Sequence, residues 1–340
     1  MTPHLAIVAV LLAFGLARIG SIAQAVEQRD SPAKVVAPLR FVVTPGGTAV
    51  NRYFSTGSLD GEPDAERAII VVHGLSRNAD AYEATGEAAV RAGGAAAAHT
   101  IVVTPQFLDD VDVAVHRLPG DTLRWSHGTW LDGQPALGPV PLSAFDVLDA
   151  LLARLSDRKR FPAMKEIVVA GHSAGGQLVQ RYAVAGRAPS GDVAVRYVVA
   201  NPSSYVYFTP DRPVAGADDC PRYNYWKYGL GDPPPYVRNT AGLEAAYVNR
   251  PVTYLLGLLD TDPHHPLLDR SCAGELEGAY RLVRGRNYVK YLHERHPGGT
   301  NQQEVDVPGV DHDGQGMFTS PCGSAVLFGA PLKTCAVTKV

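Results

Sequence analysis

The sequence of 340 residues contains no run of lysine or arginine, no Cys-x-x-Cys pair and no internal repeat. Lysine and arginine total 31, aspartate and glutamate total 34, and the formal net charge is −3. Nucleic acids and anionic membranes bind clustered basic residues, so both are poor candidate partners. Without a Cys-x-x-Cys pair, structural zinc sites and thioredoxin-like redox centres have no support in the sequence.

Long apolar runs are also missing. The stretch Leu5–Leu16 is too short for a comfortable membrane span, and Ala23-Gln24-Ala25 supplies a small-x-small cleavage site. We therefore expect a signal peptide over residues 1–25, a mature chain of residues 26–340 and a secreted or periplasmic protein. No lysine or arginine precedes the apolar stretch, so an uncleaved anchor stays open as the alternative.

The remaining composition is that of one enzyme-sized globular domain. Hydrophobic residues make up 46% of the chain and charged residues 19%, which is ordinary usage and enough for a large core.

The chain has only four cysteines, and all lie in its C-terminal half. In an oxidising compartment an even number of cysteines indicates two disulfides, for which three pairings exist. We favour Cys322–Cys335, which closes a short loop, and Cys220–Cys272, which pins an irregular segment to a later one. Four buried free thiols are the alternative.

Strand and helix patterns alternate along the chain. Apolar runs predict strands at 68–72, 101–103, 167–170, 195–200 and 252–256, a short last strand at 304–307, and an opening hairpin at 41–43 and 49–54 with its turn at 45–47. Helical patterns cover 79–91, 143–155 and most of 276–293. Such alternation predicts an α/β fold with a mostly parallel central sheet and helices on both faces. Two irregular segments interrupt it, 109–141 and a cap-like insertion at about 209–250.

The strand at 167–170 runs directly into Gly171-His172-Ser173-Ala174-Gly175, and an amphipathic helical pattern follows over 177–182. A buried strand, a Gly-x-Ser-x-Gly turn and a helix are together typical of a nucleophile elbow, which exposes the serine at the strand end. The turn is so tight that side chains at the two glycine positions would clash. A plain helix N-cap is the alternative role for Ser173.

A serine hydroxyl is a weak nucleophile near neutral pH, so it needs an adjacent base and an acid that orients that base. Among the 11 histidines, His312 alone follows the last expected strand in a glycine-rich loop. The strand at 252–256 is followed by two candidate acids, Asp260 and Asp262. Either carboxylate could reach a histidine across a loop, so both stay open from position alone.

The segment after that strand also gathers several potential metal ligands: Asp260, Asp262, His264, His265 and Asp269. Their spacing matches no established ligand set, so we expect no metal; if an ion were bound, the residues favour calcium over zinc.

The chain resembles the α/β-hydrolase superfamily over essentially all of its mature length. The resemblance rests on His73-Gly74, on Gly171–Gly175, on the Gly257-x-x-Asp260 spacing and on Gly309-Val310-Asp311-His312, in the chain order serine, acid, histidine. It implies an α/β-hydrolase fold and a cofactor-free site. It further implies Ser173 as nucleophile, His312 as general base and then acid, Asp260 as the orienting acid, and an oxyanion hole made by the backbone amides of Leu75 and Ala174.

Aromatic residues gather in the two irregular segments or just after a strand end. In an open α/β sheet these positions lie on the side where ligands bind. We therefore expect a pocket for an apolar or aromatic group, with packing of the insertions as the alternative role. The candidates for lining it are Trp125, Trp130, Tyr205 and Trp226.

Secreted members of the superfamily with this pattern are commonly carboxylic ester hydrolases. We therefore expect an exported serine hydrolase of the esterase, lipase or polyesterase kind, acting on a small or polymeric ester. A serine peptidase or amidase on the same fold uses the same three residues and remains the first alternative. A non-catalytic binding protein on a hydrolase scaffold is the second.

Overall fold

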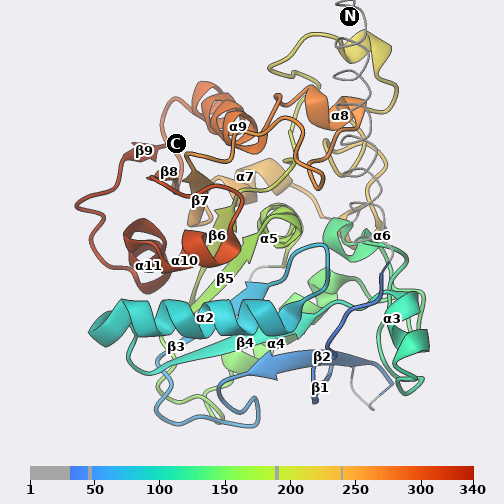
Figure 1. Cartoon of the computed structure of the whole chain (residues 1–340), viewed down its shortest axis with the longest axis vertical. Helices are drawn as coiled ribbons and strands as arrows, with labels where there is room; N and C mark the ends of the chain where they lie inside the picture. The colour runs from blue at the N-terminus through green and yellow to red at the C-terminus, as the bar shows by residue number, and fades with distance from the viewer. Residues whose placement is uncertain (1–30, 45–47, 188–190, 239) are drawn as a thin grey trace, which may run out of the picture.

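The computed structural model describes residues 31–44, 48–187, 191–238 and 240–340, and a nine-stranded sheet runs through them (Figure 1). The expected signal peptide and the hairpin turn at 45–47 lie outside the described residues. The strand order is β1-β2-β4-β3-β5-β6-β7-β8-β9. The strands are β1 (Leu39–Val42), β2 (Val50–Ser55), β3 (Arg67–Val72), β4 (Thr100–Gln106), β5 (Glu166–His172), β6 (Ala194–Ala200), β7 (Val252–Gly257), β8 (Gln302–Val307) and β9 (Val337–Lys339).

The six strands from β3 to β8 are parallel, whereas β1, β2 and β9 pair antiparallel at the two edges. The mostly parallel sheet expected from the alternating pattern is therefore confirmed. Because successive strands are parallel, their carboxyl ends meet at one edge, where the loops after β3, β5 and β7 come together.

Both faces of the sheet are covered, which explains the continuous apolar strands. In β3, Ile70 and Val72 belong to one core cluster while Ile69 and Val71 belong to the other. Side chains of α4 (Ala144–Leu155), α5 (Ala174–Ala185) and α9 (Arg281–Arg295) pack in the first cluster. Those of α2 (Ala79–Gly93), α10 (Gly314–Thr319) and α11 (Pro321–Phe328) pack in the second. A strand that is buried on both faces has a nearly continuous run of apolar residues in its sequence.

Some elements differ from the expected ones. Helix α5 is buried on all sides rather than amphipathic, since β5, β6 and the insertions enclose it. The helix expected over 276–293 begins at Arg281, after the short helix α8 (Cys272–Glu275). The helices α10 and α11 and the edge strand β9 were not expected, because each is too short to establish a period in the sequence.

The two irregular segments are largely without regular structure, as expected. The first contains α3 (Asp110–Val115) and a 3₁₀ turn, η2 (Thr129–Asp132). The second contains η3 (Ala217–Asp219), α6 (Pro235–Arg238) and α7 (Leu243–Tyr247). Among the described residues no helix is both long and apolar enough to cross a membrane.

Both favoured cysteine pairs are disulfides. Cys220 is joined to Cys272 and Cys322 to Cys335, each with a Cα–Cα distance of 5.8 Å. The first links the second insertion to α8, and the second links α11 to the segment that precedes β9.

Candidate active site

Ser173 occupies a sharp turn between β5 and α5. Its backbone has φ 59° and ψ −121°, a conformation that a non-glycine residue rarely adopts. A Cβ at Gly171 would lie 2.4 Å from the carbonyl group of Gly175, and one at Gly175 would lie 2.2 Å from the carbonyl oxygen of Val72. The elbow therefore requires glycine at both positions, as the sequence predicts.

His312 and Asp260 complete a hydrogen-bonded chain with this serine. His312 Nε2 lies 2.9 Å from Ser173 Oγ, and its Nδ1 lies 2.7 Å from Asp260 Oδ2. Asp260 follows β7, and His312 lies between β8 and α10. Asp262 is exposed, and its Oδ1 accepts the backbone amide of His264 at 2.8 Å. The geometry therefore favours Asp260 over Asp262 as the partner of the imidazole.

Burial and neighbouring charges determine the protonation states of His312 and Asp260. Burial lowers the pKa of His312, and the Arg281 guanidinium and then the neighbouring His265 lower it further. The imidazole is therefore neutral at neutral pH and able to accept a proton. Burial also raises the pKa of Asp260, but the Arg281 guanidinium opposes this effect.

Arg281 is a buried residue that the sequence did not single out. Its Nη1 lies 3.5 Å from Asp260 Oδ1, and its Nε donates to Ser203 Oγ at 3.0 Å. The arginine thus holds the acid from the side opposite His312. In the sequence Arg281 is one of several basic residues in a long helical pattern, and no feature of the sequence distinguishes it from the other basic residues of that helix.

Two further histidines pack against His312. The ring centroids of His172 and His265 lie 4.5 and 4.8 Å from that of His312. Burial keeps the pKa of His172 well below its usual value, so its ring is neutral. Tyr82 Oη lies 3.2 Å from Nδ1 of His172. These contacts fix the plane of the His312 ring.

The loop after β3 places Leu75 on the same cavity as Ser173. The amide of Ala174 belongs to the first residue of α5 and has no acceptor inside the helix. Leu75, Ala174 and Ser173 all line one cavity. This placement is compatible with the oxyanion hole expected at Leu75 and Ala174.

Buried polar groups anchor the loop that carries Leu75. Nε2 of His73 accepts the amide of Phe107 at 2.9 Å, so its Nδ1 carries the proton and donates to Gly74 O at 2.8 Å. Burial lowers the pKa of His73 to about 4, which keeps it neutral. Two residues beyond Leu75, the buried Arg77 pairs with Asp109 at 3.0 Å and with Asp112 at 2.6 Å. The His73-Gly74 motif therefore has a positioning role.

Two cavities meet at Ser173 and Leu75. One, of about 210 Å³, extends toward Gln177, Lys227 and Asp269. The other, of about 370 Å³, is lined by His312, Asp313 and Tyr82. The larger cavity is lined by His312 and the smaller one is not. The two substituents of a carbonyl group bound at Ser173 would therefore lie in different surroundings.

The four aromatic residues expected to line the substrate pocket do not line either cavity. Trp125, Trp130 and Tyr205 are fully buried in the core. Trp130 stacks on Phe107, and Trp226 is half-buried with its Nε1 donating to the backbone oxygen of Asp132 at 2.7 Å. The expectation is corrected: these rings pack the insertions onto the sheet, because their large apolar area contributes most when it is buried.

Within the described residues no group of three or more His, Cys, Asp or Glu side chains is arranged to hold a metal ion. The five residues considered for such a site have other partners or face solvent. Asp260 holds His312, Asp262 caps its own loop, and Asp269 accepts the Tyr228 hydroxyl at 2.7 Å.

The strand order, the parallel strands β3 to β8 and the elbow after β5 define an α/β-hydrolase fold. No family model and no curated protein matches the sequence. Among solved structures, the chain is similar to LpqC, a poly(3-hydroxybutyrate) depolymerase from Bordetella parapertussis, with TM-score 0.61, 20% identity and coverage of 85% of this chain and 87% of that one. It is also similar to poly(aspartic acid) hydrolase-1 from Sphingomonas sp. KT-1, with TM-score 0.59, 22% identity and coverage of 84% and 96%. At these identities the likeness concerns the fold.

Proposed function

We propose that the protein is an exported serine hydrolase that cleaves carboxylic esters through an acyl-enzyme. The observation that carries the proposal is the unbroken chain from Ser173 Oγ through His312 to Asp260. Ser173 lines two cavities, one together with Leu75 and Ala174 and the other together with Leu75 and His312.

In the proposed reaction Ser173 Oγ attacks the ester carbonyl carbon while its proton passes to His312 Nε2. The amides of Leu75 and Ala174 stabilise the oxyanion of the tetrahedral intermediate. The alcohol oxygen then leaves with the proton of His312. A water molecule, deprotonated by the same imidazole, attacks the acyl-enzyme and releases the acid. Asp260 accepts a hydrogen bond from Nδ1 of His312, which keeps the proton of the neutral imidazole on Nδ1, and it stabilises the imidazolium when that forms.

Hydrolysis of an amide is the second candidate, and a specific observation favours it. Of the two solved structures described above, one is named for an ester polymer and the other for poly(aspartic acid), whose linkages are amides. The same catalytic residues serve both reactions. We place the ester first because an ester carbonyl is less stabilised by resonance than an amide carbonyl, and an alkoxide leaves more readily than the anion of an amine.

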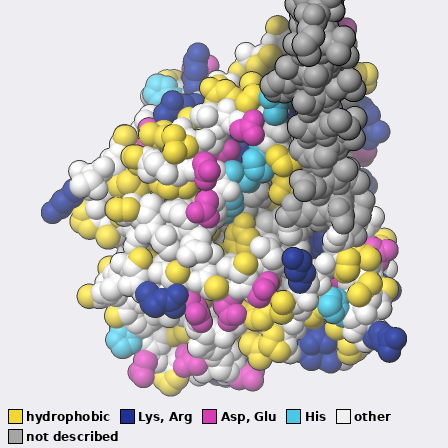
Figure 2. Space-filling model, viewed as in Figure 1, with side chains coloured by type: hydrophobic (Ala, Val, Ile, Leu, Met, Phe, Trp, Pro, Cys, Tyr) yellow, Lys and Arg dark blue, Asp and Glu magenta, His cyan; other side chains and the backbone are white. Residues whose placement is uncertain are grey.

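The proposed export rests on the two disulfides, which are typical of oxidising compartments. The proposed signal peptide at residues 1–25 agrees with it. Figure 2 shows acidic and basic side chains interspersed on the face in view, without a region of one sign. This pattern agrees with a small or polymeric ester as substrate rather than a nucleic acid.

The test is a panel of p-nitrophenyl esters of increasing acyl length, measured beside peptide p-nitroanilides. The proposal expects turnover of short esters that exceeds turnover of every anilide, and its loss in Ser173→Ala. Faster cleavage of anilides would transfer the assignment to the amidase. Absence of turnover together with no reaction at Ser173 with a fluorophosphonate would favour a binding protein.

A further inference from the structure

The smaller cavity is on the acyl side of the site, given the proposed function. His312 must protonate the leaving oxygen, so the leaving group occupies the cavity that His312 lines. The acyl group then enters the other cavity, which contains Leu75 and Ala174 but not His312. Its volume is about 210 Å³, compared with about 370 Å³ for the cavity that His312 lines. A short acyl unit therefore fits.

The wall of this cavity is polar and includes one ammonium group. Lys227 lines it, and the side chain is 24% exposed. Its Nζ lies 3.9 Å from Asp132 Oδ1 and 3.8 Å from Asp269 Oδ2, and no acceptor among the described residues lies within hydrogen-bond distance. Three N–H donors thus face a cavity beside the nucleophile with no protein acceptor of their own.

The carboxylate of Asp132, which lines the same cavity, includes an acceptor without a donor in the described part of the chain. Oδ1 of Asp132 is covered and has no hydrogen-bond partner among the described residues, although Arg181 Nη1 lies 3.4 Å away. Asp269 differs, because it already accepts the Tyr228 hydroxyl at 2.7 Å and the Ser271 hydroxyl at 2.7 Å. Lys227 therefore offers an unused donor on this cavity wall, and the Asp132 side chain, which is 20% exposed, lines the same cavity beside it.

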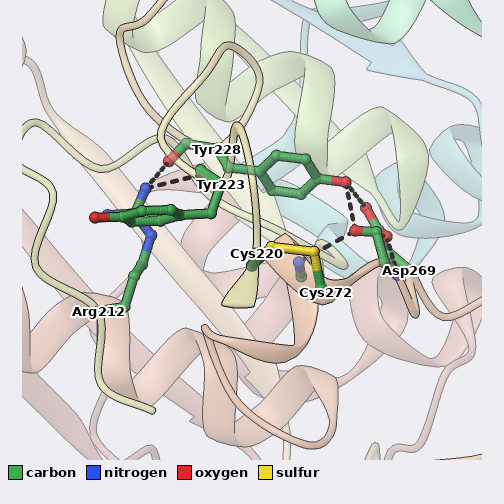
Figure 3. The surroundings of a disulfide bond; sticks show 8 residues. Arg212, Cys220, Tyr223, Tyr228, Asp269 and Cys272 are labelled. Atoms are coloured by element: carbon green, nitrogen blue, oxygen red, sulfur yellow. Dashed lines mark hydrogen bonds between the residues drawn. A yellow bond between two sulfur atoms is a disulfide. The ribbon is translucent and has the colours of Figure 1, made fainter. Parts of the chain in front are cut away.

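The segment that carries Lys227 is held in place from two sides (Figure 3). The Cys220–Cys272 disulfide ties the insertion to α8, and the ring of Tyr228 points toward Asp269. Nη2 of Arg212 donates to the backbone oxygen of Tyr228 at 2.9 Å. A side chain on so constrained a segment can discriminate between ligands, because little ordering is left to occur on binding.

We propose that the cavity lined by Lys227 and Asp132 selects short acyl groups that carry a neutral hydroxyl. Such a hydroxyl accepts a hydrogen bond from Lys227 Nζ and donates its own to the carboxylate of Asp132. An acyl carboxylate fits less well, since it would approach two carboxylates that lie within 4 Å of the ammonium. An alkyl group leaves both polar groups without partners.

The test compares three p-nitrophenyl esters: butanoate, 3-hydroxypropanoate, which has the same number of non-hydrogen atoms, and hydrogen succinate. Each kcat/KM is divided by the rate constant for alkaline hydrolysis, which removes differences in intrinsic reactivity. We expect the wild type to prefer the hydroxy ester about tenfold over butanoate and over succinate, which is the scale of hydrogen bonds to charged groups.

Lys227→Met keeps the length of the side chain without its donors, and it should bring the preference over butanoate to about one. Asp132→Asn provides a second variant of similar shape and should reduce the preference severalfold. Lys290→Met is the matched control, because that lysine is exposed on α9 and forms an ion pair with Glu294 at 3.7 Å; it should retain the tenfold preference.

A wild type that cleaves butanoate as fast as the hydroxy ester would overturn the inference and leave the ester hydrolase intact. So would an undiminished preference in a folded Lys227→Met. Failure to cleave any of the three esters would overturn the proposed function and this inference together.

Discussion

Replacement of Arg281 should shift the pH dependence of the reaction without touching a reacting atom. Arg281 is fully buried and lies 3.5 Å from Asp260 Oδ1, and its charge lowers the pKa of both Asp260 and His312. In Arg281→Gln the imidazolium of His312 loses a repelling cation, so the pKa of His312 rises. The neutral imidazole is needed for attack, so the acid limb of kcat/KM moves to higher pH.

The magnitude follows from the distance. Two unit charges at 4 Å interact by about 4 kcal/mol at an effective dielectric constant of 20. His312 lies beyond Asp260 from the guanidinium, so we expect about a third of this value to act on it. That corresponds to a shift of about one pH unit, or ~1.4 kcal/mol. Loss of one partner of a buried ion pair should also lower the free energy of unfolding by about 3 kcal/mol.

The assay is the pH profile of kcat/KM with a short p-nitrophenyl ester, beside thermal unfolding of the same samples. Arg286→Gln is the matched control on α9, because Arg286 is half-exposed and its ion pairs with Glu304 and Asp306 lie away from the site. It should leave the acid limb unchanged. An unshifted acid limb in folded Arg281→Gln would refute the electrostatic role of Arg281.

Three other predictions concern the triad acid, a disulfide and a buried glutamate. Asp260→Asn should lower kcat several orders of magnitude more than Asp262→Asn, because Asp260 lies 2.7 Å from His312 Nδ1 whereas Asp262 accepts the backbone amide of His264; the reverse ranking in steady-state kinetics would transfer the role to Asp262. The unreduced protein should show no free thiol to a thiol reagent, and replacing Cys322 and Cys335 by alanine should cost about 3 kcal/mol of stability in chemical denaturation; four titratable thiols would contradict the pairing. Burial raises the pKa of Glu277 to about 8, so folding favours its protonated form and stability should fall as pH rises from about 4.5 to about 8. Glu277→Gln should flatten that part of the profile of melting temperature against pH, and an unchanged slope would refute the assignment.

The candidate catalytic residues at the strand ends could be predicted from the sequence, because short local patterns mark their positions. Gly171 and Gly175 are required by backbone contacts within one turn, and Ser173, Asp260 and His312 each follow an apolar strand that the sequence marks clearly. In a parallel sheet such positions converge at one edge.

The surroundings of the site could not be predicted in the same way, because they depend on long-range packing. Large aromatic residues are typical of binding pockets, but three of the expected ones are fully buried in the core: Trp125, Trp130 and Tyr205. Arg281 and Lys227 become noticeable only through distances to residues far away in the chain. Position alone left both Asp260 and Asp262 open, and the Gly257-x-x-Asp260 spacing of the resemblance favoured Asp260, which the structure places against His312.

The central claim is that Ser173 is a nucleophile activated by His312. Incubation with a fluorophosphonate, followed by peptide mass spectrometry, tests it most directly. The account predicts one stoichiometric phosphonyl adduct on Ser173, formed at a rate that falls by orders of magnitude in His312→Ala, and no adduct in Ser173→Ala. Labelling at another residue, or no labelling of the folded wild type, would contradict it.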